Sequence, residues 1–183
     1  MLQEALKNFR QPVYTKTARS KDTYNSIKNR CATQIERLVE EYNSVLNDQQ
    51  LLREIRNEID YQLRRYHNYA IKENIGAHYI EVGADETDFE HMIPASTVRD
   101  LCIAGVVNAQ QALNVPTCKL SKEKHITLRE KGWGSKTPDI YNFWERYNYC
   151  FNTQGVFTTW DGQPVDTNMT LDDHFAQFVV DTV

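Results

Sequence analysis

The stretch Asp88–Gly132, DFEHMIPASTVRDLCIAGVVNAQQALNVPTCKLSKEKHITLREKG, combines ionisable side chains and chain-breaking residues at spacings that suggest chemistry. It opens with Glu90 beside His91 in a short extended segment. Pro94 ends this segment, because proline has no backbone N–H and its φ is fixed. Strand alternation places Asp88 on the same face as Glu90. The stretch therefore begins with a short strand that carries two carboxylates and an imidazole.

The second half of the stretch predicts a strand followed directly by a helix. LNVPTCKL is typical of a short strand behind Pro116, and Ser121 is a residue that favours a helix N-cap. The helix, SKEKHITLREKG, carries His125 one turn from its start. Two brief helices are predicted between the strands, one over residues 96–105 and one that starts with a capping-box pattern at 108–111. The implied order is strand, helical insertion, strand, helix.

This combination of an acid-His-Met-Ile-Pro motif, a downstream asparagine and a helix-borne histidine resembles the HNH, or ββα-metal, nucleases. The resemblance implies a metal-dependent endonuclease that hydrolyses DNA. It implies that His91 is the general base, and that Asn114 braces the loop and orients His91. It also implies that Glu90 and His125 bind the metal ion, with Asp88 as a second candidate ligand. The helical insertion and the lack of paired cysteines depart from the pattern of many members.

Phosphodiester hydrolysis needs these residue types. It requires a base for the attacking water, charge stabilisation on the phosphate and help for the departing oxygen. A neutral histidine suits the first task because its ordinary pKa lies near the working pH. Mg²⁺ is the expected cofactor, and Mn²⁺ or another transition metal also suits carboxylate and imidazole ligands. Asn108 competes with Asn114 for the bracing role, and any of these side chains could instead be structural or simply solvated.

The charge of the chain bears on its partners. The formal net charge is −4, but residues 1–35 are mainly basic and residues 138–183 mainly acidic. Basic side chains around the expected helix could neutralise phosphates. Those expected to contact nucleic acid are Lys119, Lys122, Lys124 and Arg129. A solvated helix face is the alternative explanation for these charges. DNA is the expected partner, and RNA is less favoured.

The rest of the sequence predicts helices around the ββα core. Apolar residues recur at spacings of three and four over 21–47 and again over 52–74, which predicts a helical hairpin behind a basic arm. The other expected elements are a strand over 78–82 with a possible hairpin to 88–93, a helix over 137–147, a hairpin over 156–166 and a final helix from Thr170. The fold class is therefore α+β: a helical hairpin (1–76) and an HNH-like region with a C-terminal extension (77–183), forming one compact unit. The hairpin is also a possible homodimer interface.

Length and composition limit the class of protein. The chain of 183 residues can bury a single core, and it has neither a signal-type apolar segment nor a run long enough to cross a membrane. Its four cysteines are scattered without a CxxC pair, so we expect reduced thiols and a cytoplasmic protein. Two alternatives to a nuclease stay open. One is a non-catalytic nucleic-acid-binding protein that keeps the ββα framework, and the other is a helical interaction protein.

Overall fold

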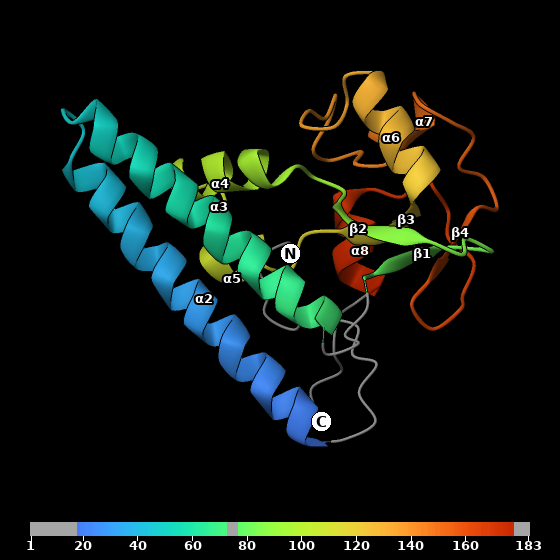
Figure 1. The fold of residues 1–183 in the computed structure, drawn as a ribbon, viewed down its shortest axis with the longest axis horizontal. Coiled ribbons are helices and arrows are strands. Elements are labelled where there is room, and N and C mark those ends of the chain that lie inside the picture. Colours follow the sequence, from blue (N-terminus) through green and yellow to red (C-terminus); the bar gives the residue numbers. More distant parts are fainter. Residues whose placement is uncertain (1–17, 73–76, 178–183) are drawn as a thin grey trace. The chain divides into compact units, whose positions relative to one another are not determined.

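The computed structural model describes residues 18–72 and 77–177, and its fold is mixed α+β (Figure 1). The chain forms two compact units. Among the described residues, the helical unit comprises 18–72 and 95–113, and the sheet unit comprises 77–94 and 114–177. The insertion between the two motif strands therefore belongs with the helical hairpin and not with the motif that it interrupts. The predicted basic arm, over residues 1–20, lies outside the described residues as far as residue 17, and residues 18–20 are helical.

The predicted helical hairpin is present. Helices α2 (Ala18–Ser44) and α3 (Gln49–Lys72) pack side by side in antiparallel directions (Figure 1). Asp48 separates them, and its carboxylate accepts a hydrogen bond from the Leu51 N–H, which caps the start of α3. Apolar residues spaced by three and four fill the contact as predicted. The fully buried members include Cys31, Ile35, Leu38, Ile55, Ile59 and Leu63.

Two short helices complete the helical unit. Helix α4 (Ala95–Ile103) packs on α3, and α5 (Ala109–Ala112) packs on α2. Buried Arg99 joins α4 to α3 through a 2.6 Å ion pair with Asp60. The predicted capping box at Asn108 is confirmed: its side chain accepts from the Gln111 N–H, and the Gln111 side chain accepts from the Asn108 N–H.

The sheet unit contains a four-stranded mixed sheet in the order β2-β3-β1-β4. Its strands are β1 (Tyr79–Glu81), β2 (Thr87–His91), β3 (Thr117–Ser121) and β4 (Phe157–Thr159). β3 pairs antiparallel with β2 and parallel with β1, while β4 is antiparallel to β1. The possible hairpin between 78–82 and 88–93 does not form, because β3 lies between these two strands. β2 is consequently an edge strand.

Helix α6 (Lys122–Glu130) follows β3 without a connecting loop and packs against both β2 and β3 (Figure 1). Ser121 is its N-cap, as predicted, and accepts from the Lys124 N–H. The antiparallel pair β2-β3 followed by α6 matches the predicted order of strand, helical insertion, strand and helix. This arrangement brings the two halves of the motif together across an insertion of two helices.

The aromatic run after α6 forms the core of the sheet unit. Phe143, Trp144 and Tyr147 are fully buried, as expected of core side chains, and the Trp144 ring packs edge-on against Tyr79 of β1. The predicted helix over 137–147 is wrong in extent, since only α7 (Glu145–Asn148) is helical. The Asp139 carboxylate accepts from the Tyr141 N–H and the Asn142 side chain, both at 2.7 Å. Local bonds of this kind compete with helix formation.

The C-terminal elements agree with expectation. A tight turn follows β4, and Thr158 forms an isolated antiparallel bridge with Pro164. Helix α8 (Leu171–Gln177) starts after Thr170, whose hydroxyl accepts from the Asp173 N–H while the Asp173 carboxylate accepts from the Thr170 N–H. Over residues 18–72 and 77–177, none of the helices has the length and apolar content that a membrane crossing requires.

Candidate active site

Two carboxylates of β2 flank one histidine of α6. Asp88 Oδ2 lies 2.8 Å from His125 Nδ1, and Glu90 Oε2 lies 3.3 Å from His125 Nε2. The register explains this, because Asp88 is paired with Leu120 and Glu90 with Cys118 of β3, on the sheet face that α6 covers. The side chains of Asp88, Glu90 and His125 are 42%, 12% and 26% exposed. The three residues predicted as metal ligands therefore form one cluster that solvent can reach.

His91 does not join this cluster. Its ring packs edge-on against that of Phe89 at a centroid distance of 5.4 Å, so both side chains lie on the sheet face opposite Glu90. The backbone pairing continues past His91, because the Met92 N–H donates to the Pro116 carbonyl. Regular alternation up to the end of β2 thus separates His91 from its neighbour Glu90.

Asn114 lies in the turn that precedes β3. It is buried, with 3% exposure, and it belongs to the segment whose Pro116 carbonyl accepts from Met92. His174 Nε2 approaches the Asn114 carbonyl at 3.4 Å. This placement suits a residue that braces the segment, and a buried amide is poorly placed to touch substrate. Asn108, the alternative candidate for the bracing role, caps α5 in the helical unit.

Arg146 is the residue of the site that the sequence did not suggest. Its side chain has no exposed surface, and Nη2 lies 2.6 Å from Glu90 Oε1. The remaining N–H groups donate to backbone carbonyls of β2's end and of the loop after α6. The acceptors are His91 at 2.7 Å, Met92 at 3.3 Å, Trp133 at 2.7 Å and Gly134 at 2.9 Å. Arg146 therefore fixes one oxygen of Glu90 and leaves the other directed at His125.

A second buried acid holds the start of α6. Glu81 of β1 accepts from the Ser121 N–H at 2.7 Å and from the Lys124 ammonium. Burial by itself would raise the pKa of Glu81, but the hydrogen bonds from Lys124 and Ser121 outweigh it and lower that pKa below its ordinary value. The ionised carboxylate thus anchors the helix that carries His125.

The four basic residues expected to bind nucleic acid have different surroundings. Lys122 forms a 2.8 Å ion pair with Glu86, and Lys124 pairs with Glu81. Lys119 is half-buried and lies opposite Phe89 in the sheet. Arg129 is exposed in the last turn of α6. Two of the four charges are thus balanced internally, and Arg129 is the one most open to a phosphate.

The geometry of Asp88, Glu90 and His125 bears on whether the site can hold a metal ion. Among the described residues, no group of three or more His, Cys, Asp or Glu side chains is arranged to hold one. Glu90 and His125 nevertheless offer an oxygen and a nitrogen 3.3 Å apart. Two adjacent ligands with bonds of about 2.1 Å lie roughly 3.0 to 3.4 Å apart, so this pair fits one edge of a coordination shell. Asp88 lies at His125 Nδ1, the position from which a carboxylate orients a histidine that binds metal through its other ring nitrogen.

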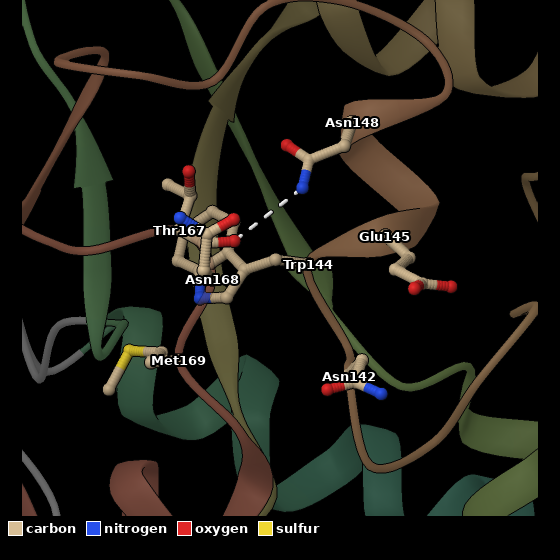
Figure 2. A pocket seen from close by; sticks show the side chains of 7 residues that line it. All are labelled: Asn142, Trp144, Glu145, Asn148, Thr167, Asn168 and Met169. Carbon is tan, nitrogen blue, oxygen red and sulfur yellow. Dashed lines mark hydrogen bonds between the residues drawn. The ribbon is translucent and has the colours of Figure 1, made fainter.

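A pocket of about 260 Å³ lies elsewhere in the sheet unit (Figure 2). The side chains that line it are mostly polar: Asn142, Trp144, Glu145, Asn148, Thr167, Asn168 and Met169. The Asn148 side chain donates to the Thr167 carbonyl at 3.5 Å (Figure 2). None of the predicted site residues lines this pocket, so the candidate site is the surface cluster on β2 and α6.

Comparisons of the chain with protein-family models, curated proteins and solved structures gave no match. The assignment of a function therefore depends on the geometry of the site.

Proposed function

We propose that the protein is a metal-dependent endonuclease of the HNH, or ββα-metal, kind that hydrolyses DNA phosphodiester bonds. The observation that carries the proposal is the pairing of Glu90 Oε2 with His125 Nε2, 3.3 Å apart across the β2-β3-α6 arrangement. Strand and helix supply one ligand each, as the motif requires. RNA is a less favoured substrate.

Glu90 and His125 would hold a divalent cation, Mg²⁺ first and Mn²⁺ as an alternative. Asp88 Oδ2 lies 2.8 Å from His125 Nδ1, where it is placed to accept from Nδ1–H and so to orient Nε2 toward the ligand position. Two protein ligands are enough for Mg²⁺, which usually keeps several waters and takes further oxygens from substrate phosphates. When bound, the cation supplies charge neutralisation at the phosphate and at the departing oxygen.

His91 is the proposed general base, although it lies on the other face of β2. β2 is the edge strand of the sheet, and the proposal requires a phosphate bound at the end of this strand to contact the metal ligands from one face and His91 from the other. Arg146 and the Asn114 segment hold the backbone at this end of the strand. A fixed backbone keeps both side chains in place while substrate binds.

Incubation of the protein with supercoiled plasmid tests the proposal. Nicked or linear DNA should appear with Mg²⁺ or Mn²⁺ and not with EDTA. His91→Ala should lower the rate by about 10² to 10⁴, the usual contribution of a general base, while the fold and DNA binding persist. Tyr61→Ala, at an exposed position of α3, is the control. An unchanged rate in folded His91→Ala removes His91 from the mechanism, and cleavage in EDTA contradicts the metal requirement.

A non-catalytic nucleic-acid-binding protein is the second candidate. The observation that favours it is the closed chain of contacts from Asp88 through His125 and Glu90 to Arg146, which satisfies these groups without a metal. A protein of this kind would bind DNA in a salt-sensitive manner. It would leave the plasmid intact with every metal.

A further inference from the structure

An exposed aromatic pair lies beside the candidate site. The rings of Trp133 and Tyr149 are stacked, with centroids 5.6 Å apart and planes inclined by 12°. Tyr149 is 61% exposed, and Trp133 is half-buried. The other large aromatic side chains nearby, such as Trp144 and Tyr147, are fully buried in the core. Packing of the core therefore does not account for the position of the Tyr149 ring.

The local sequence fixes Trp133 in place. Helix α6 ends in a turn in which Gly132 adopts a φ of +80°, and the Trp133 N–H donates to the Leu128 carbonyl at 2.8 Å. This is the Schellman arrangement, which favours glycine because other residues are strained at such a φ. Arg146 then donates to the carbonyls of Trp133 and Gly134. The backbone on both sides of the Trp133 ring is held before any ligand binds.

The same contacts connect the pair to the candidate site. Arg146 binds the carbonyl of Trp133 with one edge of its guanidinium and Glu90 with another. Tyr149 follows α7, the short helix that carries Arg146. The aromatic pair and the Glu90–His125 pair are therefore positioned by one buried side chain.

Basic side chains lie along the chain on both sides of Trp133, and Glu145 is the acidic residue one helical turn before Tyr149. Lys131 donates to the carbonyl of Cys150, the residue after Tyr149, at 2.7 Å. Arg129 and Lys136 are also exposed on this segment, and Glu130 is the one acidic residue between positions 124 and 138. A rigid aromatic face with basic neighbours matches the chemistry of single-stranded nucleic acid, whose bases stack and whose phosphates are anionic.

We propose that Trp133 and Tyr149 form a stacking platform for an unpaired nucleobase next to the cleavage site. The inference deepens the proposed function, because it makes the preferred substrate a single strand, or a duplex with an unpaired base, over a regular duplex. The bases of a regular duplex are already stacked on one another and present no free face to Tyr149. Lys131 and Arg129 then face the backbone of the same strand.

Binding measured in EDTA tests the platform separately from cleavage. A labelled single-stranded oligonucleotide and the duplex of the same sequence are titrated with the wild type, Tyr149→Ala, Tyr149→Phe and the exposed control Tyr61→Ala. Tyr149→Ala should weaken single-strand binding about 5- to 150-fold, the range for loss of one stacked base. Tyr149→Phe and Tyr61→Ala should bind as the wild type does. The salt dependence of Tyr149→Ala should be unchanged, since no phosphate contact is lost.

Tryptophan fluorescence adds a direct readout. Stacking of a base on the pair should quench the tryptophan fluorescence of the wild type when the single strand is added. Trp133→Phe should remove that quenching, while Trp144 and Trp160 still emit. Equal binding of single strand and duplex, together with wild-type binding by Tyr149→Ala, would overturn the platform. Single-strand binding without cleavage of either the plasmid or the single-stranded oligonucleotide in Mg²⁺ would instead overturn the proposed nuclease and leave the platform intact.

Discussion

At the residue scale, Arg146 explains the geometry of the site better than any residue of the motif. A buried guanidinium is stable only when its donors are satisfied, and here they bind one carboxylate and four carbonyls. The guanidinium occupies Oε1 of Glu90, so this acid can offer a metal a single oxygen. Nothing in the sequence around Arg146 distinguishes it from a surface arginine in an aromatic run.

Replacing Arg146 should therefore destabilise the sheet unit strongly. Arg146→Met leaves Glu90 as a nearly buried charge without its partner, which typically costs about 3 to 5 kcal/mol in the free energy of unfolding. Denaturant unfolding followed by tryptophan fluorescence is the measurement, because Trp133, Trp144 and Trp160 all lie in the sheet unit. The exposed Arg129→Met is the control, with an expected change within about 0.5 kcal/mol. Equal stability of the two variants would show that the buried ion pair does not hold this region together.

At the element scale, helix α8 is joined to the sheet by a buried histidine. The Tyr79 hydroxyl of β1 lies 2.7 Å from His174 Nδ1, and Nε2 lies 3.4 Å from the Asn114 carbonyl. A neutral ring with its proton on Nε2 accepts from Tyr79 and donates to Asn114. The rings of His78 and Phe143 pack edge-on against it. Burial lowers the pKa of His174 to about 3.

This depressed pKa predicts a loss of stability in acid. Below about pH 6.5 the unfolded chain binds a proton at His174 that the folded protein does not, so stability falls as the pH drops toward 3. The slope from this group approaches about 1.4 kcal/mol per pH unit within the window. His174→Gln cannot take up this proton, and its unfolding free energy should fall less steeply between pH 6 and pH 4 than that of the wild type. Parallel curves for the two proteins would contradict a neutral buried His174.

Local patterns predicted the elements better than their pairing. The helical hairpin follows from apolar spacing, and β3 with α6 follows from Pro116 and the Ser121 cap. The insertion of β3 between β1 and β2 depends on contacts between distant segments, which no local pattern encodes. The first part of the expected helix over 137–147 is not helical, and there the Asp139 carboxylate makes local hydrogen bonds that compete with a helix. The same side chain that favours a helix start can therefore also prevent one.

At the scale of the whole molecule, the site depends on parts of the chain that are far apart in sequence. Asp88 and Glu90 come from one side of the helical insertion, and His125 and Arg146 come from the other. The sequence predicted the grouping of Asp88 and Glu90 with His125, because the motif places the two acids on one strand and the histidine on the helix that follows its partner strand. The sequence did not indicate that Arg146 belongs to the site. Regular strand alternation places His91 on the sheet face opposite Glu90.

Metal binding by the Glu90–His125 pair is the most direct test of the proposed nuclease. Calorimetric titration with Mn²⁺ compares the wild type with His125→Ala, His125→Asn, Asp88→Asn and the exposed control Lys122→Ala. The wild type and the control should bind alike, and Asp88→Asn should weaken affinity about 10- to 100-fold by releasing the orientation of His125. His125→Ala should lose more, and His125→Asn less than His125→Ala, since an amide oxygen can still reach the cation. Equal affinity of folded His125→Ala and wild type, or no binding by the wild type, would contradict a ββα-metal site on β2 and α6.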